Sequence, residues 1–350
     1  MTERAAGSIR FSLFDWLDEN RRGQASGYDD RLNMLEYADK AGFYSYHLAE
    51  HHGTSLSTVP SPNLFLAAAA QRTSRIRLGA LTYVLPLYNP LRLLEELSML
   101  DQLSHGRLDM GIGRGAGPDE GSAFGVTGAN SRAIFKEALD VVLGGLSTGE
   151  LNYAGEYFRY DHVKTRLRPW QRPYPPLWYP TSNIESIPWI AGQGISTVFS
   201  VHLSPDFGKI ERMLELYSRE HEAHRNDPNR LNGHVDRPMH GFLAHVYLAE
   251  TDELARQQAK PAWAVYYENF TTRYGAKNPW ADHRDFEQQV TQQKMLVGSP
   301  ATVRRQLSEW FDRAPANYFV GCFSFGSLTG DQILSSIDLF AREVMPAFGS

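Results

Sequence analysis

Residues 89–117 read NPLRLLEELSMLDQLSHGRLDMGIGRGAG, and this stretch decides the fold class. Asn89 followed by Pro90 is typical of a helix start, because asparagine can cap the first turn and proline has no N–H to leave unpaired there. Leucines then recur on one helical face, and residues 108–113 alternate as a short strand. The glycines around Arg114 let the backbone approach a ligand closely. Together these features indicate an α/β protein that presents a cation to an anionic ligand at a strand's carboxyl end.

The composition limits the class of protein. A chain of 350 residues is long for one average domain but normal for an α/β barrel with insertions, so we expect residues 1–350 to form a single domain. A formal net charge of −5 gives no sign of nucleic-acid binding. The longest apolar run, at 64–70, is too short to span a membrane, and the first residues lack the apolar core of a signal peptide. A single cysteine fits a reducing compartment, and we expect a cytoplasmic protein.

An apolar strand, a short loop and an amphipathic helix recur along the chain. The expected strands are 9–14, 44–49, 76–83, 108–113, 177–179, 197–201, 241–248 and 318–325. The expected helices are 29–41, 62–73, 90–105, 132–144, 184–192, 206–223, 300–311 and 331–345. Eight alternating pairs favour a parallel sheet, and their number favours a closed (β/α)8 TIM barrel.

Two stretches exceed ordinary loop length, and we expect them to be insertions after strands 4 and 7. Residues 149–176 contain LNYAGEYFRY, which predicts a small hairpin, and end in a proline-rich lead-in to the fifth strand. Residues 250–294 carry four aromatic residues at helical spacing: Trp263, Tyr266, Tyr267 and Phe270. A helix that packs on the barrel is favoured over a lid that covers a substrate.

Glu50, His51 and His52 directly follow the second expected strand. In a barrel such residues point into the mouth, and adjacent side chains on extended backbone point to opposite sides, so one histidine faces inward. A histidine there can move a proton near neutral pH, whereas a capping or packing role is equally expected from the pattern alone. A metal site would need further converging ligands, and the sequence contains no HxH or HExxH motif.

Arg114 follows the fourth expected strand, and Arg132 begins the fourth expected helix. Two guanidinium groups near one strand exit can hold a phosphate, and the helix N-terminus adds a favourable potential. The alternative is a pair of surface ion pairs with Asp119 or Glu120. The glycines beside Arg114 favour the phosphate.

Across the expected mouth, Thr181, Ser182 and Asn183 follow the fifth strand and offer groups that suit phosphate oxygens. Ser186 is a weaker candidate because Pro188 complicates the helix start. The spacing Gly111, Gly113, Ala116 matches a dinucleotide fingerprint only weakly, since it lies in the fourth unit and no acidic residue follows at the required distance. The absence of G-x-S-x-G argues against an α/β-hydrolase.

Six segments in order are recognisable together, and they cover most of the chain: AEHHGT at 49–54, the run at 78–115, FGV at 124–126, SRAIF at 131–135, PYPPLWYP at 173–180 and VGSPATV at 297–303. This arrangement resembles the bacterial luciferase-like flavin monooxygenases. The resemblance implies a (β/α)8 barrel that binds reduced FMN (FMNH2) at its carboxyl-terminal mouth. It also implies a non-proline cis peptide at the bond between Leu81 and Thr82.

The same resemblance assigns the site residues. Arg114 and Arg132 would hold the FMN phosphate, helped by Ser182, Asn183 and Ser186. Glu50 and His51 would line the chamber for flavin and oxygen, with His51 as the catalytic residue that moves a proton. Light-emitting luciferases carry a cysteine at the position of Gly113, so the glycine argues against bioluminescence.

The expected function is an FMN-dependent monooxygenase in which reduced flavin and O2 form a C4a-peroxyflavin that oxidises a small, largely apolar organic substrate. A separate flavin reductase would supply the FMNH2, because no convincing NAD motif is present. Alternatives are an oxidoreductase dependent on the deazaflavin F420, a non-catalytic flavin-binding barrel and, more remotely, a Rossmann dehydrogenase. The apolar helices 62–73 and 90–105 favour a homodimer over coverage by the chain's own insertions.

Overall fold

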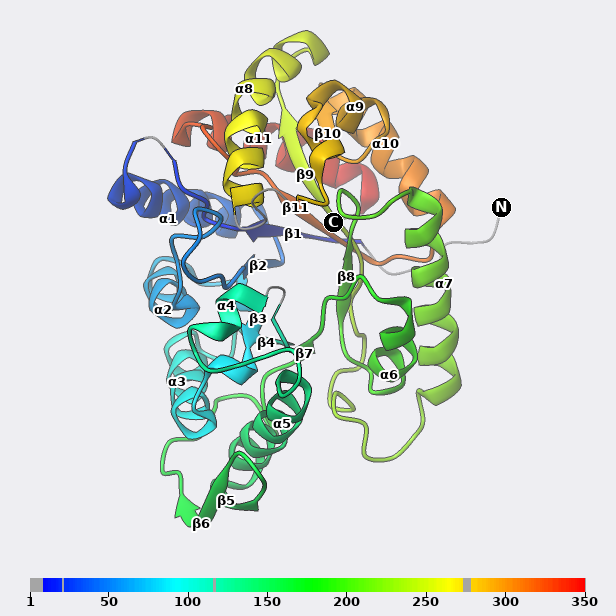
Figure 1. The fold of residues 1–350 in the computed structure, drawn as a ribbon. Coiled ribbons are helices and arrows are strands. Elements are labelled where there is room, and N and C mark those ends of the chain that lie inside the picture. The colour runs from blue at the N-terminus through cyan, green and yellow to red at the C-terminus, as the bar shows by residue number, and fades with distance from the viewer. Residues whose placement is uncertain (1–8, 21, 116–117, 273–277, 350) are drawn as a thin grey trace.

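The computed structural model describes residues 9–20, 22–115, 118–272 and 278–349. Figure 1 shows parallel strands in the middle of the molecule with helices around them. The strands are β1 (Arg10–Asp15), β2 (Ser45–Leu48), β3 (Arg77–Val84), β4 (Leu108–Gly113), β5 (Glu150–Ala154), β6 (Arg159–Lys164), β7 (Leu177–Trp178), β8 (Thr197–Ser200), β9 (His240–Leu248), β10 (Leu296–Gly298) and β11 (Tyr318–Cys322). All eight expected strands are present.

The helices match the expected ones within a few residues, except that α1 begins five residues earlier and α11 gives way to short helical turns after residue 339. They are α1 (Gln24–Ala41), α2 (Pro62–Arg72), α3 (Pro90–Leu103), α4 (Pro118–Ser122), α5 (Ser131–Thr148), α6 (Ile187–Gly192), α7 (Phe207–His224), α8 (Asp252–Thr271), α9 (Phe286–Thr291), α10 (Pro300–Arg313) and α11 (Gly330–Leu339). The short α4 and α9, and the strand β10, were not predicted.

The main sheet is parallel throughout. Its pairings run from β1 through β2, β3 and β4 to β7, and in the other direction from β1 through β11 and β9 to β8. An isolated parallel bridge joins Trp178 to Ser196, just before β8. The extra strand β10 pairs only with the last residues of β9. The carboxyl ends of these strands therefore gather at one end of the sheet, where a site is expected.

The helix caps explain several boundaries. Asn89 accepts a hydrogen bond from the backbone of Arg92, and Ser299 accepts one from Thr302, so both proline-led helices begin as the sequence predicts. Ser61 precedes Pro62 in the same way but makes no capping bond. Asn130 does not cap α5; its side-chain oxygen instead accepts from the N–H of Thr127.

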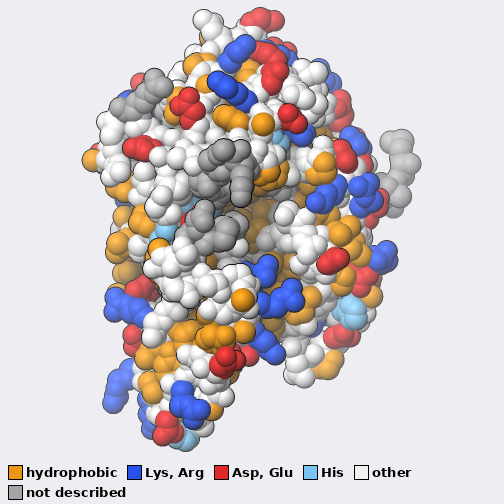
Figure 2. Space-filling view, viewed as in Figure 1, with side chains coloured by type: hydrophobic (Ala, Val, Ile, Leu, Met, Phe, Trp, Pro, Cys, Tyr) orange, Lys and Arg blue, Asp and Glu red, His pale blue; other side chains and the backbone are white. Residues whose placement is uncertain are grey.

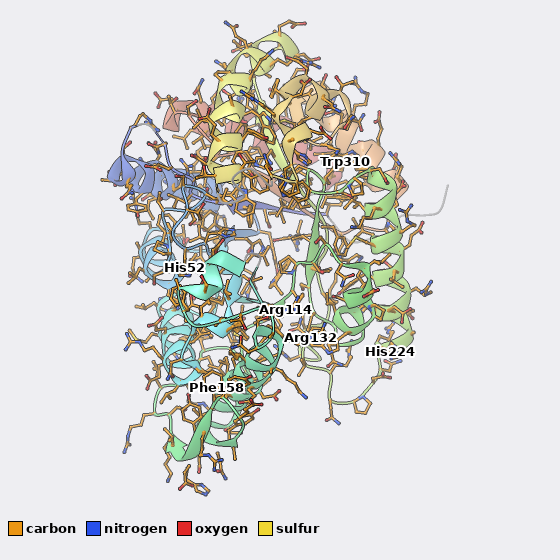
Figure 3. All side chains as sticks on the ribbon, in the orientation of Figure 1. His52, Arg114, Arg132, Phe158, His224 and Trp310 are labelled. Carbon is orange, nitrogen blue, oxygen red and sulfur yellow. The ribbon has the colours of Figure 1, made fainter. Side chains whose placement is uncertain are left out.

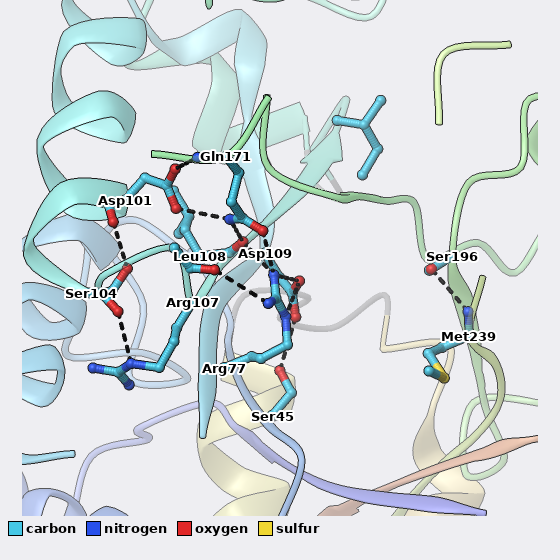
Figure 4. A network of polar contacts seen from close by, with 12 residues as sticks. Ser45, Arg77, Asp101, Ser104, Arg107, Leu108, Asp109, Gln171, Ser196 and Met239 are labelled. Carbon is cyan, nitrogen blue, oxygen red and sulfur yellow. Dashed lines mark hydrogen bonds and ion pairs between the residues drawn. The ribbon is translucent and has the colours of Figure 1, made fainter. Parts of the chain in front are cut away.

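A polar network fixes the lead-in to β7 at the amino ends of the strands (Figure 4). Gln171 donates from its backbone and its amide to the two carboxylate oxygens of Asp101, both at 2.8 Å. Arg77 joins Gln171 to Asp109, which lies 2.8 Å from the guanidinium. Because Asp101 belongs to α3 and Asp109 to β4, the network positions β7 against both. The expected hairpin is also present as β5 and β6, and it follows α5, not β4 directly.

The long segment after β9 forms α8, which packs on the carboxyl ends of the strands. Trp263, Tyr266 and Phe270 are buried, whereas Tyr267 is half-buried, so the aromatic face of this helix is part of the core. Asn269 donates to the carboxylate of Asp18 beyond β1 at 2.9 Å. These contacts favour a packed helix over a lid. Among the described residues, no helix combines the length and the apolar character needed to cross a membrane.

Candidate active site

A cavity of 670 Å³ lies beyond the carboxyl ends of β1 to β4 and β7. Its volume falls within the range of roughly 300–1,000 Å³ that small-molecule sites occupy. All nine residues that the sequence singled out line it: Glu50, His51, Leu81, Thr82, Arg114, Arg132, Ser182, Asn183 and Ser186. They come from five separate segments of the chain, so the parallel sheet brings together residues up to 136 positions apart in sequence.

Arg114 and Arg132 form the cationic end of the cavity. Figure 2 shows Lys and Arg side chains below the central hollow of this face, and Figure 3 places the two arginines next to each other there. Both are exposed, and neither guanidinium has a hydrogen bond or ion pair with any residue that the structure describes. Both lower the pKa of the nearby Tyr179, against the larger effect of burial, which raises it. Two neighbouring cations for which the described part of the chain offers no carboxylate partner favour an anionic ligand.

The alternative pairing of these arginines with Glu120 is wrong, because Glu120 faces His51 instead. The side chain of Asp119, the other proposed partner, lies outside the described residues, as do Ala116 and Gly117 of the glycine loop.

The turn after β7 borders the same end of the cavity. Asn183 accepts from the backbone N–H of Glu185 and donates its own N–H to Thr181. Lys209, in the first turn of α7, donates to the carbonyl of Ser182 at 2.9 Å. These bonds hold the turn in place. The helix behind the turn is short, since a single 3-10 turn (Ile184–Ser186) precedes the six-residue α6.

His51 lies on the cavity wall and pairs with Glu120 behind it. The Nδ1 atom of His51 lies 3.0 Å and 3.2 Å from the two carboxylate oxygens of Glu120. The same carboxylate accepts from the backbone N–H of His52 at 3.3 Å. Because Glu120 occupies Nδ1, it fixes the ring orientation of His51. The Trp16 ring lies 5.5 Å from the His51 ring and also lines the cavity.

Glu50 lines the cavity, but its carboxylate is committed to protein partners. It accepts from the backbone of Val84 at 3.1 Å and from the hydroxyl of Tyr88 at 2.7 Å, and it lies 2.9 Å from Nε2 of His52. The Glu50 carboxylate raises the pKa of His52, while burial and the same carboxylate raise the pKa of Tyr88. Glu50 therefore links the segments after β2 and β3. The His52 side chain points away from the cavity and toward Glu50.

The bond between Leu81 and Thr82 is a non-proline cis peptide, as the resemblance implied. A Cβ atom at Gly113 would lie 2.2 Å from the hydroxyl oxygen of Thr82. Only glycine lets β4 approach Thr82 this closely, so the glycines of the opening motif shape the cavity wall.

Sequence reasoning missed further residues of the cavity, among them Trp16, Phe135 and Tyr179, and it missed Glu120 as the partner of His51. Trp16 follows β1 and Tyr179 follows β7, so their positions at strand ends were a signal that could have found them. Among the described residues, no group of three or more His, Cys, Asp or Glu side chains is placed so that it could hold a metal ion.

Comparisons with known proteins agree with this architecture. The family profile described as luciferase-like monooxygenase matches residues 9–317. The oxygenase component of a flavin-dependent trigonelline monooxygenase from Acinetobacter baylyi is 26% identical over 97% of this chain and 96% of its own. The crystal structure of monooxygenase RslO1 from Streptomyces bottropensis superposes with a TM-score of 0.82 at 27% identity, covering 97% of this chain and 100% of the other.

More distant structures share the fold. The oxygenating constituent of 3,6-diketocamphane monooxygenase from Pseudomonas putida, solved with FMN, gives a TM-score of 0.81 at 21% identity, with 97% and 98% of the two chains covered. An F420-dependent secondary alcohol dehydrogenase gives 0.71 at 16%, with 98% and 99% covered. The profile match over most of the sequence, together with relatives that are named monooxygenases, shows that this chain belongs to the luciferase-like monooxygenase family.

Proposed function

We propose that this protein is an FMN-dependent monooxygenase that receives reduced FMN from a separate flavin reductase and uses O2 to oxidise a small organic substrate. The observation that carries the proposal is a pair of guanidinium groups at one end of a 670 Å³ cavity, those of Arg114 and Arg132, which have no ion-pair partner among the described residues. The FMN complex of the diketocamphane enzyme and the oxygenase component named for trigonelline support the choice of cofactor and reductase.

The phosphate of FMN fits the cationic end. Two guanidinium groups can neutralise a dianion, and Arg132 is the second residue of the 18-residue α5, whose N-terminus adds positive potential. The hydroxyls of Ser182 and Ser186 and the amide of Asn183 border the same space and would supply neutral hydrogen bonds. Leu81 and Thr82 would then lie along the ring system, deeper in the cavity.

Bound reduced FMN supplies the reaction with molecular oxygen, and the protein supplies orientation and proton transfer. His51 lines the cavity with its Nδ1 held by Glu120, and an imidazole so oriented could move a proton to or from the reacting oxygen. Glu120 acts as a positioning residue. The aromatic rings of Trp16 and Phe135 line the rest of the space and exclude water.

We also infer that the eight strands close into a barrel within one domain. Support comes from the bridge between Trp178 and Ser196 and from one buried cluster that unites side chains of β1, β3, β7, β8, β9 and β11, among them Leu81, Val198 and Leu243. A cytoplasmic location remains a prediction from the single cysteine and the ordinary charge.

The phosphate assignment is tested by comparing FMN with riboflavin, which lacks the phosphate. Arg114→Ala should weaken FMN binding about 10- to 100-fold, because a charge-assisted hydrogen bond contributes about 1.5–3 kcal/mol, and should leave riboflavin affinity nearly unchanged. Flavin fluorescence titration measures both affinities. The control is Arg159→Ala on the distant hairpin strand β6, which should alter neither.

Equal weakening of FMN and riboflavin would remove Arg114 from the phosphate site. Failure of the wild-type protein to bind FMN at millimolar concentration, with binding of F420 instead, would replace the FMN proposal by the deazaflavin alternative.

The role of His51 has its own test. His51→Ala should keep FMN affinity within about twofold and slow the reaction of bound reduced flavin with O2 by about 100-fold, the lower end of what a positioned acid or base contributes. Stopped-flow absorbance of anaerobically reduced protein mixed with oxygenated buffer measures the rate. An unchanged rate would assign His51 to packing, the alternative that the sequence left open.

A further inference from the structure

Tyr179 lines the 670 Å³ cavity together with Arg114 and Arg132. It is the first residue after β7, and its backbone carbonyl accepts a hydrogen bond from the hydroxyl of Thr197 at 2.8 Å. The side chain is half-buried, so it belongs to the wall of the cavity and not to the sealed core. Strand β7 therefore places a phenol at the cationic end of the cavity.

Two aromatic side chains from different helices hold the Tyr179 ring. The Phe135 ring of α5 lies 6.0 Å away at an interplanar angle of 82°, and the Trp189 ring of α6 lies 5.7 Å away at 81°. Both are edge-to-face arrangements, which are favourable for aromatic pairs. Because Arg132 and Phe135 are three residues apart in α5, they share one face of that helix. The helix that orients the tyrosine ring thus also carries one of the two cations.

The hydroxyl of Tyr179 makes no hydrogen bond with any residue that the structure describes. Burial raises the pKa of this hydroxyl, and the positive charges of Arg114 and Arg132 lower it by a smaller amount. The hydroxyl is therefore protonated at pH 7 and can donate a hydrogen bond. Since the charges of both guanidinium groups act on it, the hydroxyl lies in the same positive field that favours an anion.

Packing alone gives no reason for a hydroxyl at this position. A phenylalanine would contact Phe135 and Trp189 through the same ring edges and faces. A guanidinium group carries only donors, so neither arginine can accept the hydroxyl proton. The acceptor must come from a ligand or from water, and a dianion held by two arginines offers several acceptor oxygens.

We propose that the Tyr179 hydroxyl donates a hydrogen bond to the phosphate of the bound flavin, so that Tyr179 helps to select FMN over riboflavin. This inference rests on the proposed function, because it assigns Tyr179 to the phosphate end of the same cavity. Arg114 and Arg132 supply the charge, and Tyr179 supplies a neutral donor that adds no repulsion between cations. Its ring is already held by Phe135 and Trp189, so little side-chain entropy is lost when the phosphate binds.

Removal of a single oxygen atom tests the proposal. Tyr179→Phe should weaken FMN binding about tenfold, because a hydrogen bond to a charged group is lost, and should change riboflavin binding by less than about twofold. Fluorescence titration measures both affinities. Tyr157→Phe, in the turn between β5 and β6, is the matched control and should alter neither. Equal weakening of FMN and riboflavin, or unchanged FMN binding, would assign Tyr179 to packing and overturn the proposal.

Phosphorus NMR gives a readout that packing of the ring does not move. At saturating FMN, the 31P resonance of the bound phosphate should differ in chemical shift between the wild-type protein and Tyr179→Phe. The spectrum of Tyr157→Phe should match that of the wild type. Identical 31P shifts in all three proteins would contradict a hydrogen bond from Tyr179 to the phosphate.

Inorganic phosphate separates this inference from the proposed function. The wild-type protein should broaden the 31P resonance of inorganic phosphate, and Tyr179→Phe should broaden it less. A wild-type protein that binds phosphate through Tyr179 but does not bind FMN would contradict the proposed function alone. A wild-type protein that prefers FMN to riboflavin, with Tyr179→Phe behaving identically, would contradict this inference alone. Binding of neither FMN nor phosphate would contradict both.

Discussion

Among single residues, Asp18 shows a consequence of burial that can be measured. Its carboxylate accepts from Asn269 and from the backbone of Gly326, both at 2.9 Å, and burial raises its pKa from the ordinary value to about 6. Since the folded pKa lies above the unfolded one, the stabilising contribution is complete below about pH 4 and is lost as the pH rises through 6. Asp18→Asn keeps the shape and both acceptor contacts. We expect it to raise the free energy of unfolding at pH 8 by about 2–3 kcal/mol and to add little at pH 4.

Urea denaturation across pH 4–8 measures this difference, and parallel curves for variant and wild type would contradict it.

The residues of the candidate site show how much of it the sequence could predict. Positions after strand ends predicted that His51 and Arg114 face one cavity. The sequence could not predict which of these side chains pair with each other. Glu120 pairs with His51 and not with Arg114 because of the position that α4 takes across the mouth.

At the scale of elements, the close packing of α8 against Gly326 positions the long segment after β9. Gly326 has a φ of 57°, and a Cβ atom there would lie 1.9 Å from the carbonyl oxygen of Ala262 in α8. Gly326→Ala combines left-handed backbone with overpacking, so we expect a loss of about 2–5 kcal/mol in the free energy of unfolding. Gly144→Ala in α5, with open space around it, should be neutral or stabilise by up to about 1 kcal/mol. Equal urea midpoints for the two variants would show that the close packing of α8 on Gly326 does not contribute to stability.

The elements themselves were largely predictable. Asn89 and Ser299 precede prolines and cap their helices, and these local signals act without tertiary contacts. The unpredicted α9 and β10 have six and three residues. Segments this short have too few residues for a periodic pattern, and packing against α8 and β9 stabilises them instead.

For the whole molecule, alternation of strands and helices predicted a parallel sheet, and parallel order brings every strand end to one side. That rule accounts for the convergence of nine predicted residues on one cavity. It could not predict that His202, His245 and His283, the last in the 3-10 turn Ala281–Arg284, pack together, because they span 81 positions and share no motif. Their meeting depends on where the 3-10 turn after α8 packs, which periodicity does not encode.

The outer face of α2 and α3 carries the last prediction. Leu64 is 77% exposed, Met99 54% and Leu103 41%, and an apolar groove of 340 Å³ lies beside Leu64 between α1 and α2. Exposed apolar side chains on adjacent helices favour association, and a second copy of the chain offers a face of the same kind. We expect a homodimer of twice 39.5 kDa that dissociates when Leu64→Glu and Met99→Glu are combined, since two buried charges per chain oppose each other across a symmetric interface. Sedimentation velocity measures the mass, and Leu167→Glu, at an exposed leucine before β7, is the control that should remain dimeric. A wild-type protein that sediments as a monomer at all concentrations would show that this face is open to solvent.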